Sequence, residues 1–447
     1  MAHEKSGTVV KDSFLKTYVD RVSAFSRNAR LYLTSAVISG MVMGVFQLLF
    51  NFYLLSLGFD EVVIGNLVTV RSATSLVAAF PMGYVTDRIG RKNAFFFGYI
   101  AVGFSVGMML LFPTLIVLNI MNVTMGFGQS LSMVAMGPFL MENSGEKERT
   151  YLFSFASGIG MVASSIGQWF GGYLPGWMGS LFAVAPSSAT AYAWSISVVV
   201  LGMMLALVPN LMISKTRLLS SERSTFAPLA YMKANPGGLT RLIAPMLITS
   251  IGAGMIMPFM NLFFRNVHNQ SDAAIGVMFA WGSLAMAIGL LIAPVLAEKY
   301  GKIEIVVLSQ ALSIPFLAML GFSPIFSISL VAYYVRIMLM NMSGPVYSTF
   351  VMERVDAKYR AMVASLSSMA HQFGWAFSPT ISGFLQVRYG FKPAFMVTIA
   401  FYLVAISMYY LWFWKNRHVA HQEGGLERPG DLMTEASVTE SVNEGTA

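Results

Sequence analysis

Long apolar stretches separated by short polar loops make up most of this 447-residue chain. A helix needs roughly 20 apolar residues to cross the hydrocarbon of a bilayer. Twelve stretches reach this length or come close to it, which predicts an all-α polytopic membrane protein with 12 transmembrane helices. The expected spans are 32–57, 63–86, 94–112, 114–141, 150–174, 190–213, 239–265, 273–298, 303–322, 324–352, 360–386 and 392–414.

The basic residues gather on one side of these spans. Twelve spans place both termini on the same side, so the loops alternate between two faces. Of the 29 Lys and Arg residues, 24 lie in the terminal segments and the loops of that side, whereas the opposite loops hold three. Loops rich in Lys and Arg face the cytoplasm. We therefore expect a multi-pass protein of the cell (inner or plasma) membrane, with both termini in the cytoplasm.

The first six spans resemble the last six. Glycines and charged residues recur at a fixed separation of 211 positions; the pairs are Gly65 and Gly276, Asp87 and Glu298, Glu142 and Glu353, Arg149 and Arg360, and Gly172 and Gly383. Such spacing predicts two repeats of the same orientation. The expected organisation is a cytoplasmic N-terminal segment (1–31), a six-helix bundle (32–213), a cytoplasmic linker (214–238), a second six-helix bundle (239–414) and a disordered cytoplasmic tail (415–447).

Composition narrows the function classes. Charged residues make up 11% of the chain, against about 25% in an average soluble domain. There is no cysteine, which excludes a disulfide framework, a thiol catalyst and a thiolate metal site. The net charge of +8 comes from loops that would meet anionic headgroups. We expect the lipid bilayer as a partner, with no nucleic acid, no metal and no cofactor.

A ten-residue loop follows the second span and reads Gly83-Tyr84-Val85-Thr86-Asp87-Arg88-Ile89-Gly90-Arg91-Lys92. It returns in weakened form as Pro294-Val295-Leu296-Ala297-Glu298-Lys299-Tyr300-Gly301-Lys302. The pattern resembles the signature loop of the major facilitator superfamily of transporters. The resemblance implies two pseudo-symmetric six-helix bundles that rock about a central site and expose it to each side of the membrane in turn.

The resemblance also implies a charged latch on the cytoplasmic side. Asp87 would reach across the halves to the start of helix 11, near Arg360, and Glu298 would make the mirror contact near Arg149. A carboxylate at a helix N-terminus gains about 0.3–1 kcal/mol when exposed. Within each half, Glu142 and Arg149, or Glu353 and Arg360, are expected to pair with Arg91 and Lys302. The alternative is that these charges fix topology and stay solvated, since exposed pairs contribute about 0–1 kcal/mol. The candidate gate residues are Gly83, Asp87, Arg88, Gly90, Arg91, Lys92, Glu142, Arg149, Glu298, Lys302, Glu353 and Arg360.

Two arginines lie at membrane depth, Arg71 in the second span and Arg336 in the tenth, and no acidic residue lies in the middle of any span. A buried arginine costs at least about 2.5–3.5 kcal/mol on insertion scales, so it faces a cavity or a partner. Both arginines are candidates for binding an anionic group. The alternative is that each bonds to backbone carbonyls and polar neighbours. His371, midway along the eleventh span, is a candidate proton carrier or a neutral hydrogen-bonding group between helices.

In the superfamily, helices 1, 4, 7 and 10 line the cavity, and amides at depth need partners inside the bundle. The predicted substrate-binding residues are therefore Arg71, Arg336, Gln47, Asn51, Gln129, Asn261, Asn341 and Tyr333. The chain also has 33 Met and 34 Phe, with which an adaptable apolar pocket is easily built.

These observations predict a secondary active transporter, not an enzyme. No catalytic group and no nucleotide-binding loop is recognisable. We expect an antiporter or efflux protein of the plasma membrane that exports a small amphipathic organic solute with an anionic group, acting as a monomer, with protons as a candidate coupling ion. The alternatives are a proton-coupled multidrug exporter and a lipid or lysolipid transporter. Outside transport, the alternative is a membrane receptor or scaffold.

Overall fold

The computed structural model describes residues 23–145, 149–214, 236–355 and 360–415, and the following statements concern these residues. They form helices at all 12 expected spans and contain no strand. The N-terminal half contains α2 (Arg27–Ser56), α3 (Glu61–Ile89), α4 (Arg91–Leu111), α5 (Leu115–Glu142), α6 (Arg149–Gly171) and α8 (Ala189–Leu211). The C-terminal half contains α10 (Pro236–Ile256), α11 (Met260–Asn266), α12 (Asp272–Tyr300), α13 (Lys302–Phe322), α14 (Phe326–Glu353), α15 (Arg360–Tyr389) and α16 (Phe391–Tyr409).

Ten of these spans are long and apolar enough to cross a membrane. The other two, α6 and α15, have 23 and 30 residues. Both pack against the other half of the molecule: α15 against α3, and α6 against α12. Both helices therefore lie at the seam between the two halves.

The local structure departs from the expected spans in three places. Pro258 interrupts the seventh span, where a 3₁₀ turn (Met257–Phe259) separates α10 from α11, because proline cannot donate the helical hydrogen bond at its position. A short helix, α7 (Leu174–Phe182), lies between the fifth and sixth spans. The last span ends in a π-helical turn (Tyr410–Trp414). Most of the expected terminal segment, linker and tail (1–31, 214–238 and 415–447) lies outside the described residues.

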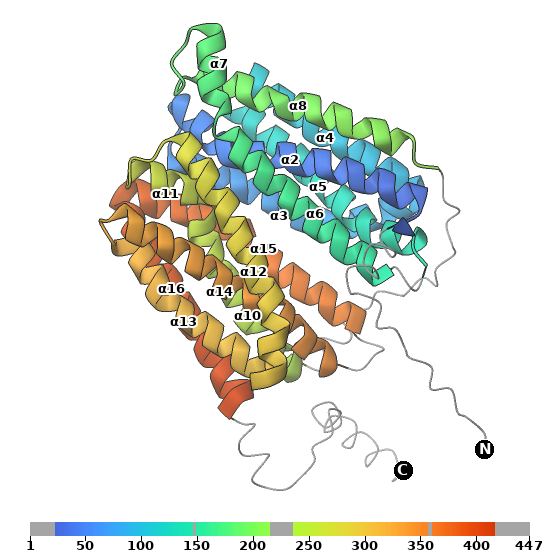
Figure 1. The fold of residues 1–447 in the computed structure, drawn as a ribbon, viewed down its shortest axis with the longest axis vertical. Coiled ribbons are helices and arrows are strands. Elements are labelled where there is room, and N and C mark those ends of the chain that lie inside the picture. Colours follow the sequence, from blue (N-terminus) through green and yellow to red (C-terminus); the bar gives the residue numbers. More distant parts are fainter. Residues whose placement is uncertain (1–22, 146–148, 215–235, 356–359, 416–447) are drawn as a thin grey trace, which may run out of the picture.

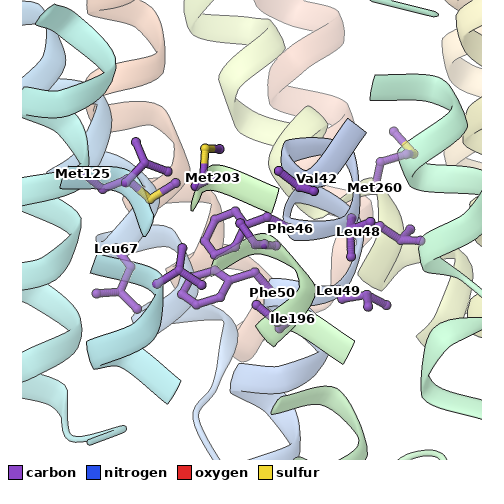
Figure 2. Close-up of a cluster of buried hydrophobic side chains, with 14 of the residues drawn as sticks. Val42, Phe46, Leu48, Leu49, Phe50, Leu67, Met125, Ile196, Met203 and Met260 are labelled. Atoms are coloured by element: carbon purple, nitrogen blue, oxygen red, sulfur yellow. The ribbon is translucent and has the colours of Figure 1, made fainter. Parts of the chain in front are cut away.

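Apolar side chains fill the interior of each half. In the N-terminal half, Phe46 and Phe50 of α2 stack with ring centroids 4.5 Å apart and lie in one cluster with Leu67 of α3 and Met125 of α5 (Figure 2). All four are buried. The cluster extends through α8 and includes Met260 of α11, which belongs to the other half.

The two bundles meet at one end and diverge toward the other (Figure 1). We call the end at which α2, α4, α6, α10, α13 and α15 begin the basic face, and the other end the opposite face. The bundles lie together near α11, at the opposite face. Glycines permit this approach: a Cβ on Gly276 would lie 2.6 Å from the backbone oxygen of Gln168, and one on Gly172 would lie 2.6 Å from that of Asp272.

The same contact is repeated at the crossing of α3 and α15. A Cβ on Gly65 would overlap the backbone of Pro379, and one on Gly383 would overlap that of Glu61. These four glycines are the two repeat-related pairs recognised in the sequence. The repeat therefore places a pair of glycines at each of the two helix crossings that join the halves.

We predict that Gly65→Ala opens the opposite face, because overpacking costs about 1–3 kcal/mol, enough to shift a two-state equilibrium by about tenfold. The chain has no cysteine, so one introduced at Thr69 reports on this seam alone. Its alkylation by a reagent supplied at the opposite face should be about tenfold faster in the Gly65→Ala background. Gly158→Ala is the matched control, since no atom lies within 4 Å of the added carbon. Equal rates in the two backgrounds would contradict the prediction.

Candidate functional site

A cavity of about 170 Å³ lies at the seam between the halves. Its lining residues are Met43 and Gln47 of α2, Arg71, Ser72 and Ser75 of α3, Gln129 of α5, and Gln372 of α15. Gln372 alone comes from the C-terminal half. Arg71 is half-buried, with its guanidinium 5.9 Å from the centre of the Phe46 ring. No carboxylate of the described residues lines the cavity, so it carries an uncompensated positive charge.

Two asparagines close the cavity toward the opposite face. Asn51 of α2 donates from Nδ2 to the backbone oxygen of Pro258 at 2.7 Å and to Oδ1 of Asn261 at 3.0 Å. Asn261 of α11 donates from Nδ2 to the backbone oxygen of Leu48 at 2.9 Å. Each asparagine thus bonds to the carbonyl three residues before the other. We call this reciprocal arrangement the asparagine clasp; both side chains are buried.

The clasp lies just beyond the cavity along α2, because Gln47 precedes Asn51 by one helical turn. A second bond closes the neighbouring seam: the hydroxyls of Thr69 in α3 and Thr380 in α15 are 2.9 Å apart. Gln372 lies about 12 Å before Thr380 along α15, on the side of the basic face. Both bonds therefore separate the cavity from the opposite face.

A charged cluster lies farther out on the opposite face and also joins the halves. Tyr192 of α8 donates to Oδ2 of Asp272 at 2.5 Å and accepts from Arg265 at 2.8 Å. Arg265 lies 3.7 Å from Asp272 and stacks over the ring of Phe52, 4.5 Å from its centre. The nearby His268 packs among phenylalanine rings, and burial lowers its pKa. His268 is therefore neutral at pH 7.

The family can be assigned at this point. A family model described as Major Facilitator Superfamily matches residues 32–244 and again residues 242–442, once for each half. The chain belongs to the major facilitator superfamily. Among curated proteins, none matches it at a significant level.

Solved structures of other transporters share this superfamily fold. A bacterial homologue of the human lysosomal transporter Spinster, inward-facing and occupied, has a TM-score of 0.72 at 15% identity and covers 86% of this chain and 95% of its own. A mutant form of the nucleoside transporter NupG has a TM-score of 0.71 at 13% identity and covers 87% of this chain and 100% of its own. At such identities the likeness is one of fold.

The signature loop of the superfamily forms pairs within each half. Arg91 lies 2.5 Å from Asp87 and 3.4 Å from Glu142. The repeat-related pair, Lys302 with Glu353, is also present. Gly90 and Gly301, related by the same repeat, have φ of 85° and 98°, a conformation that favours glycine. Lys92 donates to the backbone oxygens of Leu211 and Ile213, both at 2.6 Å.

The expected bond between Asp87 and Arg360 remains a prediction. The side chains of Arg149 and Arg360 lie outside the described residues, while those of Asp87, Arg88 and Glu298 are exposed. The side chain of Asp87 is 69% exposed, so it remains available for a partner other than Arg91. Gly83 is only loosely packed, since an added Cβ would lie 3.9 Å from Val134.

The structure brings together three of the eight predicted substrate-binding residues, Gln47, Arg71 and Gln129. Arg336 is 2% exposed and donates to the Tyr402 hydroxyl at 3.0 Å, inside the C-terminal half. Tyr333 is buried against the rings of Phe264 and Phe279. Asn341 donates to the Ile337 carbonyl of its own helix. Asn51 and Asn261 bond across the halves as the clasp. The side chain of His371 is exposed and lies outside the cavity lining.

Four lining residues were not among the predicted set: Met43, Ser72, Ser75 and Gln372. Ser75 lies one turn from Arg71, so helical spacing from that arginine would have located it. Ser72 is the next residue in the sequence, which helical spacing does not place on the same face. Gln372 follows His371 in the eleventh span, which the superfamily resemblance does not count among the cavity helices. Its place in the lining depends on the packing of α15 against α3.

Asn51→Ala should destabilise the protein, because it removes two bonds of the clasp and each buried polar group left unpaired costs about 1–3 kcal/mol. We expect the Tm in detergent to fall by a few degrees. Asn119→Ala is the control, since Asn119 donates to the Leu115 carbonyl of its own helix through a solvent-exposed hydrogen bond. The double variant Asn51→Ala, Asn261→Ala should lose less than the sum of the single losses; strict additivity would show that the two amides act independently.

Proposed function

We propose that this chain is a secondary active transporter that works by alternating access and exports a small organic solute carrying an anionic group. The single observation that carries the proposal is Arg71, a guanidinium in a cavity at membrane depth with no carboxylate among the lining residues. A cation in such a place needs a partner. A guanidinium binds carboxylate or phosphate oxygens through two parallel hydrogen bonds.

Alternating access is supported by the uneven distribution of contacts between the halves. The asparagine clasp, the Thr69–Thr380 bond and the Tyr192–Asp272 bond all lie toward the opposite face. The charged pairs that the described residues form at the basic face lie within one half each. If the basic face is cytoplasmic, as its Lys and Arg content predicts, this conformation is closed to the outside and open to the cell interior.

In this proposal, the outward-facing conformation forms when the bonds at the opposite face break and the cytoplasmic latch closes. Asp87 would then leave Arg91 for the N-terminus of α15 near Arg360, and Glu298 would make the mirror contact at α6. Export by exchange for protons, a place in the plasma membrane and a monomeric state complete the proposal. His371 is its candidate coupling residue, and it involves no catalytic step.

Arg71→Gln should weaken the binding of anionic organic ligands by at least about tenfold, because a hydrogen bond to a charged group contributes about 1.5–3 kcal/mol. Arg71→Lys keeps the charge without the paired geometry and should retain part of the affinity. The measurement is the ligand-induced rise in Tm of the purified protein, followed by transport of the same ligands in vesicles. The control is Arg388→Gln, which alters an exposed arginine near the C-terminal end of α15. Anion binding unaffected by Arg71→Gln would refute the proposed site.

Asp87→Asn tests the latch separately. It should slow transport by about twofold to fivefold, the factor that corresponds to ~0.3–1 kcal/mol at a helix N-terminus, and leave membrane insertion unchanged. Asp60→Asn is the matched control at the other end of α3, where Asp60 accepts from the Val63 backbone N–H and asparagine caps equally well. Wild-type transport by Asp87→Asn would remove the latch from the proposal while leaving the anion site in place.

A further inference from the structure

The wall of the cavity is almost entirely polar. Of its seven lining residues, Met43 alone is apolar; the others carry one guanidinium, two hydroxyls and three carboxamides. The volume of about 170 Å³ is small beside the ~300–1,000 Å³ of pockets that hold drug-sized apolar ligands. An amphipathic solute would require an apolar wall for its hydrocarbon part.

The apolar side chains of the neighbourhood are already packed against one another. Phe46 and Phe50 point into the cluster with Leu67 and Met125 (Figure 2), and each is at most 5% exposed. Apart from Met43, the Met and Phe side chains of this neighbourhood therefore pack the core beside the cavity and do not line it. A hydrocarbon body placed in the cavity would leave amides and hydroxyls without partners, at a cost of about 1–3 kcal/mol for each buried group.

The polar groups of the wall are largely unused by the protein. Within the described residues, the polar side chains of the wall take part in one hydrogen bond, and it is long: Gln168 Nε2 donates to Gln47 Oε1 at 3.5 Å. Each glutamine offers both a donor and an acceptor, as a hydroxyl or amino group of a solute requires. Gln47, Gln129 and Gln372 come from three different helices, so they reach a bound molecule from separate directions.

We infer that the solute is a hydrophilic organic anion whose body bears several hydroxyl or amino groups, read by Gln129 and Gln372 while Arg71 holds its anionic group. This inference rests on the proposed function and replaces the apolar body expected from the sequence. Because Gln372 belongs to α15, a solute bound to Arg71 and Gln372 bridges the two halves. Recognition of the body is thereby linked to the relative position of the halves.

Three six-carbon probes separate the features of the solute: D-gluconate has both the carboxylate and the hydroxyls, hexanoate has only the carboxylate, and D-glucose has only the hydroxyls. The measurement is binding to the purified full-length protein by ligand-induced Tm shift and isothermal titration calorimetry. We expect gluconate to bind at least about tenfold more tightly than either of the others, because a site built to hydrogen-bond a substrate rejects analogues that lack its polar groups.

Gln129→Leu and Gln372→Leu should each weaken gluconate by about tenfold and leave hexanoate unchanged or tighter. Gln270→Leu, in the loop before α12, is the matched control. Because the hexanoate measurement shows that each variant retains a competent site, a loss confined to gluconate cannot be a folding defect.

The outcomes separate the inference from the function on which it rests. Hexanoate binding as tightly as gluconate, glutamine variants without effect, or no binding of any probe at millimolar concentration would overturn the inference. If hexanoate binds as tightly as gluconate, or if the glutamine variants have no effect, a loss of binding in Arg71→Gln would still support the proposed anion site. If glucose binds as tightly as gluconate and Arg71→Gln does not change either affinity, the solute needs no anionic group. That result would overturn the proposed function as well.

Discussion

The interior of a membrane contains no water to hydrogen-bond a polar side chain, so each such group must find a partner within the protein or face a cavity. This constraint places the polar residues of the chain. The amides of Asn51 and Asn261 bond to one another and to backbone carbonyls of the opposite half. Arg336 bonds to the Tyr402 hydroxyl. Arg71, with three glutamines and two serines, lines the cavity between the halves.

The duplication makes a reversible seam possible. Two related helix pairs, α3 with α15 and α6 with α12, cross at related glycines and hold the halves together at one face. The asparagine clasp has the same two-fold character, with each amide bonded to the carbonyl three residues before its mate. Its bonds are ordinary in length and few in number, so the seam is held by interactions that a change of conformation can exchange for others.

Arg71 and Arg336 have the same signature in the sequence, a lone arginine at depth with no acid in any span, and their surroundings differ. Arg336 lies within reach of Tyr402 from α16 and is enclosed by its own bundle. Arg71 is on a helix that faces the other half, and it remains beside open space. The choice between a cavity and a partner depends on which distant helix packs against each arginine, and no local pattern records this.

The sequence by itself determined the class of protein, the 12 helices, the two related halves and the pairs of charges at the basic face, because hydrophobic length and repeat spacing are properties of the linear chain. It also identified three lining residues, Gln47, Arg71 and Gln129. Only the tertiary structure decided that Asn51 and Asn261, 210 positions apart, bond to each other, that Gln372 joins the cavity, and that Phe46 and Phe50 pack the core beside it. These outcomes depend on how two bundles fit together across a seam, and the packing of residues distant in sequence is settled only when the chain has folded.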